Sequence, residues 1–97
     1  MKDILSDLNK AFESRVRLGI MSILMVNDYA DFNTLKEMLE VSDGNLASHI
    51  SALEKLEFLT VSKSFEGKKT KTTYTATDTG RKAFKDHLDA LERLMAG

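Results

Sequence analysis

The sequence NTLKEMLEVSDGNLASHISALEKL, residues 33–56, predicts two short helices joined by a tight turn. In the first half, Leu35, Met38 and Leu39 recur at helical spacing. In the second half, apolar residues follow one another at steps of four, three and three: Leu46, Ile50, Leu53 and Leu56. Because only residues 40–42 link the two segments, the helices must cross steeply to pack these stripes together, which predicts a helix-turn-helix.

The predicted helices begin at residues that can cap free backbone N–H groups. Asn33 is the predicted N-cap of the first helix, and Ser42 or Asp43 is that of the second. Upstream, Ser14 opens a further helix, whose apolar residues predict that it lies at the centre of the core: Val16, Ile20, Ile23 and Leu24. Residues 29–32 are expected to form a brief edge strand before the helix pair.

The second helix of the pair carries short hydrogen-bonding groups on its polar face. If its leucines point inward, small and short polar residues point outward: Asn45, Ser48, His49 and Ala52, with Ser51 and Lys55 at the margins. Asparagine can bind adenine bidentately, serine can donate or accept a hydrogen bond, and alanine can contact a thymine methyl group. This face therefore fits the major groove of DNA; the alternative is a face that is merely polar or that contacts a protein partner.

Downstream, the sequence period changes from that of a helix to that of a strand. Residues 58–65 and 70–77 alternate between two faces, and Gly67 lies between them, where it can adopt a positive φ. This pattern predicts a β-hairpin with three lysines at or just past its tip: Lys68, Lys69 and Lys71. Such charges can also protect a sheet edge from aggregation. Three neighbouring cations repel one another unless an anion is near, so the hairpin is predicted to contact phosphates.

The positive charge of the chain is concentrated in this hairpin. The whole chain has a formal net charge of −1. Residues 1–57 hold six Lys or Arg against ten Asp or Glu, residues 58–77 hold four against one, and residues 78–97 hold four against four. Phosphate binding depends on the local field within about 8 Å at physiological salt, so one basic segment can suffice on a nearly neutral protein.

Both ends of the chain carry apolar stripes that a small core does not need. Asp3–Ala11 predicts one helix, and a long last helix is expected with Thr77 or Asp78 as its N-cap. We therefore expect a single domain, residues 1–97, whose terminal helices, about 3–12 and 78–95, pair with those of a second copy. The expected dimer interface consists of Ile4, Leu5, Leu8, Leu88, Leu91 and Met95.

The order of elements gives an α+β, mostly α fold: helix, short strand, helix-turn-helix, two-stranded wing and long C-terminal helix. Residues 32–84 resemble the small stand-alone winged-helix transcriptional regulators related to the MarR and ArsR groups. The resemblance rests on SDGNLASHISALEKLEFL for the recognition helix and first wing strand, FEGKKTKTTY for the wing, and TATDTGRKAF for the return into the last helix.

This resemblance implies a sequence-specific regulator that binds double-stranded DNA as a homodimer. It implies that the second helix enters the major groove and that the wing lies along the backbone or minor groove. By position, it implies base contacts from Asn45, Ser48 and His49. It also implies backbone contacts from Thr34, Ser51, Lys68, Lys69 and Lys71.

The chain departs from these relatives in two respects. Its wing uses only lysine, which places a point charge instead of a planar fork and weakens the case for minor-groove reading. ArsR-type metal sensing needs cysteines or clustered histidines, whereas this chain has no cysteine and only His49 and His87. We therefore expect no metal and no other cofactor. His87 is expected at an interface or on the surface, and His49 is expected to face DNA.

An enzyme and a protein-interaction module are the rival classes of function. No phosphate loop, nucleophile elbow or paired-carboxylate pattern is present, and Ser48 and His49 point about 100° apart on a helix, so no catalytic residue is expected. A docking module without direct DNA binding remains the alternative, because winged helices also serve that role. The lack of cysteine and of any run of about 18 apolar residues predicts a cytoplasmic protein without membrane contact. Whether a small molecule acts as effector stays open.

Overall fold

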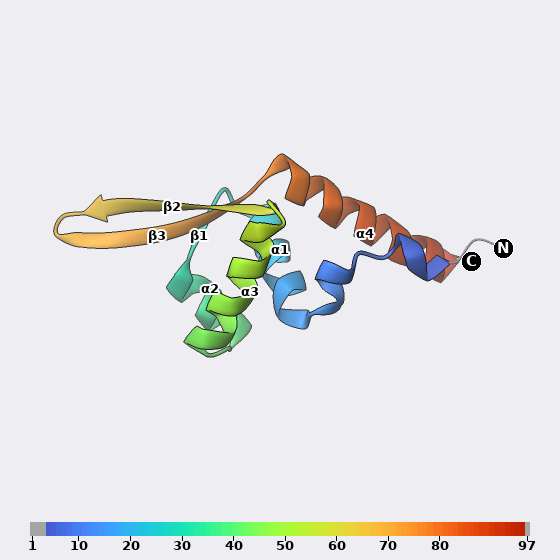
Figure 1. Ribbon diagram of the computed structural model, residues 1–97, viewed down its shortest axis with the longest axis horizontal. Coiled ribbons are helices and arrows are strands. Elements are labelled where there is room, and N and C mark those ends of the chain that lie inside the picture. Colours follow the sequence, from blue (N-terminus) through green and yellow to red (C-terminus); the bar gives the residue numbers. More distant parts are fainter. Residues whose placement is uncertain (1–3, 97) are drawn as a thin grey trace.

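The computed structural model describes residues 4–96 and has the predicted order of elements (Figure 1). The α-helices are α1 (Arg15–Val26), α2 (Phe32–Leu39), α3 (Asp43–Lys55) and α4 (Asp78–Ala96), and the strands are β1 (Ala30–Asp31), β2 (Leu59–Glu66) and β3 (Lys69–Ala76). The strands form an antiparallel sheet in the order β1-β3-β2. This architecture confirms the predicted mostly helical winged helix-turn-helix.

Helix α1 lies at the centre of the core, where it contacts α2, α3, α4 and β3. Its N-cap is Ser14, as predicted, which accepts a hydrogen bond from the Arg17 N–H. The largest fully buried side chains come from α1, from both helices of the pair and from the start of the wing: Ile20, Met21, Leu24, Leu35, Leu46, Leu53 and Leu59. Burying each such side chain contributes about 1.5–3 kcal/mol, so these stripes hold the helix pair on α1.

Helices α2 and α3 are fixed to each other at their short turn. Glu40 ends α2 in the left-handed conformation, with a φ of +53°. Ser42 then caps α3 by accepting a hydrogen bond from the Asn45 N–H at 3.2 Å, which confirms one of the two predicted caps. An ion pair of 2.7 Å between Lys36 and Asp43 spans the turn. The orientation of α3 is therefore set by local bonds as well as by the core.

Helix α2 begins at Phe32, one residue before the predicted cap, Asn33. The true N-cap is Asp31, whose carboxylate accepts a hydrogen bond from the Thr34 N–H at 2.8 Å. Both Asp and Asn are good caps. The edge strand decides between them, because Ala30 pairs with Tyr74 and holds the chain extended up to Asp31. The brief edge strand itself was predicted and is confirmed.

This cap makes part of the stability of α2 depend on pH. The hydrogen bonds from Thr34 lower the pKa of Asp31 from its ordinary value of 3.8, and Lys71 lowers it further. A lowered pKa in the folded state stabilises the fold above the ordinary pKa, and this contribution is lost as the pH falls through the folded-state value. Asp31→Asn keeps a capping oxygen but does not titrate. We expect the advantage of wild type over this variant in urea denaturation to be present above the ordinary pKa of 3.8 and to be lost as the pH falls below it. An advantage that is constant with pH would contradict this account.

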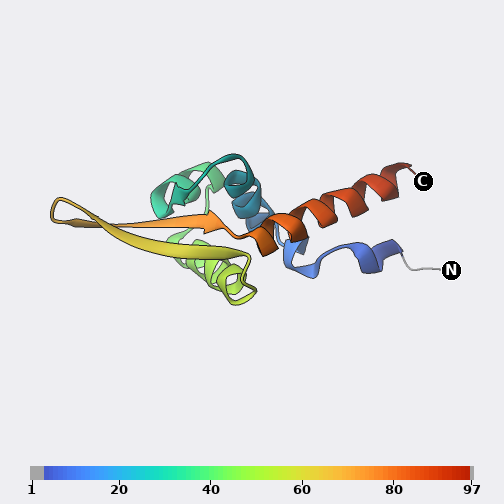
Figure 2. The same cartoon turned by 90° about the horizontal axis from the view of Figure 1, so that it is seen from above.

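Strands β2 and β3 pair along their whole length and form the predicted hairpin. The turn has two residues, Gly67 and Lys68, and Gly67 has a φ of +65°, as the first position of a tight hairpin turn requires. Residues 62–70 are all exposed. In Figures 1 and 2 this outer part of the hairpin extends past the helices, at the end opposite to the chain termini.

The N-terminal segment differs from the single helix predicted over Asp3–Ala11. Asp3 lies outside the described residues, and the rest forms two short 3-10 turns, Ile4–Asp7 and Lys10–Glu13. The break falls at Asn9, whose side-chain oxygen accepts a hydrogen bond from a backbone N–H two residues on. Short polar side chains compete with helical hydrogen bonds in this way, which explains why the segment does not continue as a helix.

His87 of α4 is buried, so the expectation that it lies at an interface or on the surface is wrong. Its Nδ1 accepts a hydrogen bond from the Asn9 N–H at 3.0 Å. Its ring lies against Phe12, with 5.2 Å between the ring centroids. The histidine therefore holds the N-terminal segment on α4.

The start of α4 is bonded to the end of the helix pair. Thr77 is the cap, as one of the two predictions had it: its hydroxyl accepts a hydrogen bond from the Gly80 N–H and donates one to the Glu57 carbonyl at 2.6 Å. The Thr77 N–H donates to the Phe58 carbonyl at 3.0 Å. A Cβ on Gly80 would clash with the same carbonyl, so glycine permits the close approach.

Between residues 4 and 96, no helix is long and apolar enough to cross a membrane.

Candidate nucleic-acid interface

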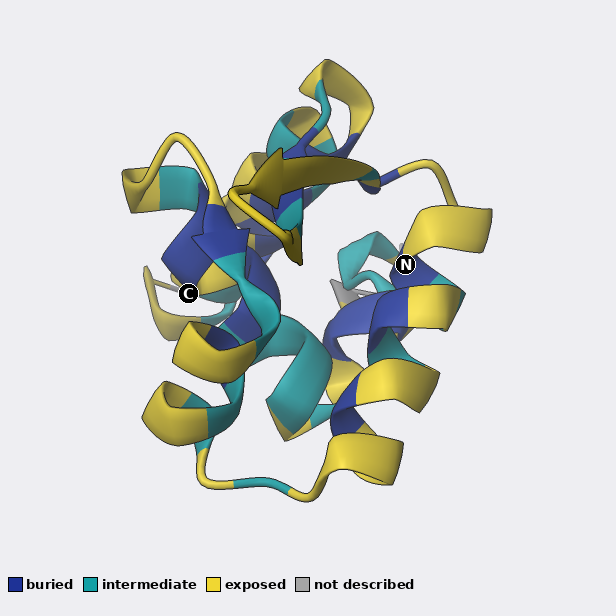
Figure 3. Ribbon diagram, turned by 90° about the vertical axis from the view of Figure 1, so that its left-hand side faces the viewer, coloured by how far each residue is buried: buried dark blue, intermediate teal, exposed yellow. Residues whose placement is uncertain are grey.

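Helix α3 buries its leucine and isoleucine stripe and exposes a face of small and short polar groups. The residues most distant from the core recur at steps of four, three and four: Gly44, Ser48, Ser51 and Lys55, with Asn45 and Ala47 beside them. Figure 3 shows this exposed side of α3 beside the wing, which points at the viewer. Asn45 and Ser48 are exposed, as predicted. Gly44 and Ala47 were missed, although their spacing from Ser48 places them there.

His49 does not belong to this face, which corrects the expected orientation. Its side chain is half-buried, and its Nδ1 accepts a hydrogen bond from Arg17 Nε at 3.0 Å. The physical reason is its position three residues after Leu46 and four before Leu53, at the edge of the buried stripe. Ala52, also expected to face outward, is half-buried as well. The bond between Arg17 and His49 ties α3 to α1, and it joins residues too distant in sequence to be paired from spacing.

The two hydroxyl residues expected to contact the DNA backbone differ in their environments. Ser51 is exposed on the outer face of α3. Thr34 is exposed at the start of α2, and its N–H donates a hydrogen bond to Asp31. Ser51 therefore lies on the candidate surface, whereas Thr34 serves first to start its helix.

The lysines of the wing lie on different sides of the hairpin. The strand register places Lys63 on one face, while Lys69 and Lys71 project from the other, and Lys68 lies in the turn. All but Lys71 are exposed. Lys63 was not among the predicted contact residues, although it is part of the same basic segment.

Lys71 is held by its neighbours. Its Nζ lies 3.3 Å from a carboxylate oxygen of Glu66 and 6.0 Å from the centre of the Tyr29 ring. The hydrogen bond to Glu66 and the charge of Glu66 raise the pKa of Lys71. The structure thus separates the predicted wing lysines into two exposed ones, Lys68 and Lys69, and one that is already paired.

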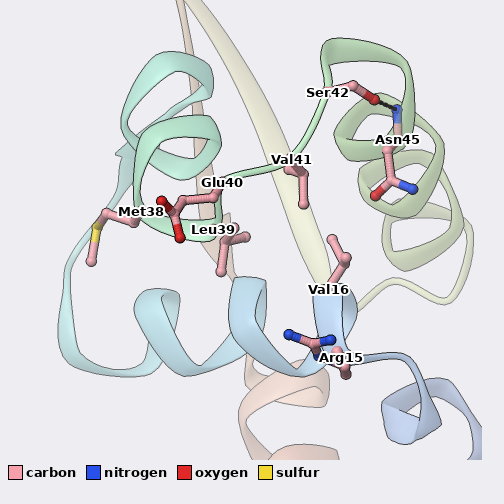
Figure 4. A pocket seen from close by; sticks show the side chains of 8 residues that line it. All are labelled: Arg15, Val16, Met38, Leu39, Glu40, Val41, Ser42 and Asn45. Atoms are coloured by element: carbon pink, nitrogen blue, oxygen red, sulfur yellow. Dashed lines mark hydrogen bonds between the residues drawn. The ribbon is translucent and has the colours of Figure 1, made fainter.

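A hollow of about 610 Å³ lies at the foot of α3, between the start of α1 and the helix-turn-helix turn (Figure 4). It is lined by Arg15, Val16, Met38, Leu39, Glu40, Val41, Ser42 and Asn45. Asn45 therefore has open space on one side of its amide, so this side chain is accessible from outside the helix pair.

A comparison with known proteins decides the family. Residues 16–95 match the family model described as a winged helix DNA-binding domain. The chain belongs to this family. This match confirms the predicted resemblance to small winged-helix regulators, and the family points away from an enzyme.

Individual proteins share the sequence or the fold of this chain. An uncharacterized protein of Methanocaldococcus jannaschii is 40% identical over 79 residues, which cover 81% of this chain and 86% of the relative. The solved structure of a transcriptional regulator homologue from Pyrococcus horikoshii OT3 has a TM-score of 0.79 at 29% identity, over 95% of this chain and 96% of that one. Bacillus subtilis PadR, solved in complex with operator DNA, has a TM-score of 0.68 at 18% identity, over 76% of this chain and 46% of that one, and this likeness shows the fold alone.

Proposed function

We propose that the protein is a sequence-specific transcriptional regulator that inserts α3 into the major groove of double-stranded DNA and lays its wing on the phosphate backbone. The observation that carries this proposal is the exposed face of α3, which has small and short polar side chains and lies beside a lysine-bearing hairpin. A helix with this face can approach base edges closely, and a cationic hairpin can bind the neighbouring phosphates.

Base contacts are assigned to Asn45 and Ser48. Both are exposed near the start of α3, and the small Gly44 and Ala47 beside them let the helix backbone approach the groove. The amide of Asn45 can donate and accept at the same base, which suits adenine. His49 is assigned a positioning role, because its Nδ1 is occupied by Arg17.

Backbone contacts are assigned to the exposed cations of the wing, Lys68, Lys69 and Lys63, and to Ser51 on α3. Lysine binds a phosphate as a point charge, so these contacts hold the protein on DNA without reading sequence. Each lysine that neutralises a phosphate steepens the fall of log K with log salt by about 0.9.

We further propose that a second copy covers the terminal stripes. The stripe on α4 is buried at Phe84 and continues to Leu88 and Met95, which are exposed by 45% and 83%. Leu5, in the N-terminal segment beside α4, is exposed by 64%. Leu8 and Leu91 are half-buried beside them, and the side chain of Ile4 lies outside what the structure describes. A two-fold pair would present two α3 helices to half-sites about 34 Å apart, so the operator should be close to palindromic.

Two sets of variants test the assigned roles. Asn45→Ala and Ser48→Ala should each lose about 1–3 kcal/mol of binding to a duplex selected from a random pool, and much less on random DNA. Lys68→Gln and Lys69→Gln should weaken both duplexes alike and reduce the salt slope by about 0.9 each. The measurement is a fluorescence-anisotropy titration of both duplexes at several salt concentrations.

Two outcomes would contradict the assignment. If both sets of variants affected selected and random DNA equally, α3 would not be the element that reads sequence. If wild type showed no DNA binding that weakens with salt, the alternative function, a protein-interaction module, would be favoured instead.

A further inference from the structure

Lys71 differs from the other lysines of the wing because its ammonium group already has a carboxylate partner. Lys71 lies on the hairpin face that also carries Glu66, and the two side chains form an ion pair of 3.3 Å. The side chain of Lys71 is 32% exposed, whereas that of Glu66 is 69% exposed. The lysine is therefore the covered member of the pair, and the carboxylate is the member that faces solvent.

Other groups support the same position of Lys71. The Tyr29 ring centre lies 6.0 Å from its ammonium group, and the negative charge of Asp31 also acts on it. Tyr29 directly precedes β1, so the lysine is held between the wing and the edge strand. Lys68 and Lys69 are exposed, and of the wing lysines only Lys71 has an ion pair within the described part of the chain.

We propose that Glu66 is an internal competitor of DNA phosphate for Lys71, and that it thereby limits the affinity of the wing for the DNA backbone. This inference rests on the proposed function. Glu66 neutralises the charge of Lys71 while the two are paired, so a phosphate oxygen gains little from the same ammonium group until Glu66 releases it. Glu66 lies at the tip of the wing and the proposed base-contacting residues lie on α3, so it should limit binding to every duplex without changing the preference among sequences.

The competition has a measurable signature in salt. A surface ion pair contributes only about 0–1 kcal/mol, so the change in affinity at one salt concentration is small. The salt slope is more informative, because it counts phosphate contacts and each adds about 0.9. Glu66→Gln should release Lys71 and steepen the slope by this amount. The tightening should then be about 3.5-fold larger at 50 mM than at 200 mM salt.

The test is an anisotropy titration of a random duplex at 50 and 200 mM salt with four variants of the full chain. Glu66→Gln should bind more tightly with the steeper slope. Lys71→Gln should leave the slope of wild type nearly unchanged, and adding it to Glu66→Gln should remove the gain. Asp89→Asn is the control, because it removes one negative charge from an exposed position on α4, far from the wing. Circular dichroism checks that all variants are folded.

Three results would overturn the inference while wild type still binds DNA. The slope of Glu66→Gln could equal that of wild type, its gain could survive the loss of Lys71, or Asp89→Asn could show the same gain. The second result would mean that Glu66 acts only by repelling DNA, and the third that net charge alone matters. Absence of salt-dependent binding by wild type would instead overturn the proposed function, and with it this inference.

Discussion

Gly80→Ala is expected to destabilise the fold by about 3 kcal/mol or more, the largest effect that we predict for a single methyl group. The added Cβ would clash with the carbonyl of Phe58. Both partners are backbone, and the Thr77 N–H donates a hydrogen bond to the same carbonyl, so neither side can move without breaking the start of α4. Urea denaturation of the variant measures the loss.

Gly44→Ala is the matched control for this substitution. Gly44 is also in the first turn of a helix, but nothing lies within 4 Å of the position that its Cβ would take. Alanine is a better helix former than glycine, so this variant should be as stable as wild type or more stable by up to about 1 kcal/mol. If Gly80→Ala were as stable as Gly44→Ala, the close packing of α4 on Phe58 would not hold in solution.

Leu88→Glu combined with Met95→Glu is expected to convert a dimer into a monomer, with a dissociation constant raised at least about 100-fold. Leu88 and Met95 lie on the exposed continuation of the α4 stripe, where a second copy is proposed to pack. Each new carboxylate would be buried without a partner in such an interface. Sedimentation at micromolar concentration gives the mass of each form.

The same double variant should lose most of its affinity for a palindromic duplex, because a monomer cannot engage both half-sites at once. Lys82→Glu is the control, since it places a carboxylate at an exposed position about 120° around α4 from Leu88. This control should remain dimeric. A monomeric wild type would remove the dimer proposal, and a dimeric double variant would place the interface elsewhere.

The periodicity of the sequence predicted the helices and strands because each apolar stripe is formed by residues of one continuous segment. The stripe of Leu46, Ile50 and Leu53 defines α3, and alternation defines the wing. Competition among nearby acceptors for backbone N–H groups was harder to predict. Asp31 and Asn33 are equivalent as caps until the edge strand selects one, and the side-chain hydrogen bond of Asn9 replaces the predicted N-terminal helix by two short turns.

The sequence predicted the orientation of a candidate site residue only where its position within one helix determines that orientation. Asn45 and Ser48 are exposed because their positions on the helix require it. His49 and Lys71 were expected to face DNA, but each is engaged by a residue brought to it by the tertiary fold: Arg17, 32 positions away, and Glu66, across the hairpin. Such pairs depend on packing and strand twist, which residue spacing does not encode.

The bonds from Thr77 to Glu57 and Phe58 have a consequence for operator choice. They hold the end of α3 against the start of α4, so we expect these two helices to keep a fixed orientation to each other. In a symmetric pair, the angle at which the two α4 helices cross would then set the distance between the two α3 helices. Any ligand or substitution that changed this angle would shift the preferred operator spacing without touching a single base contact.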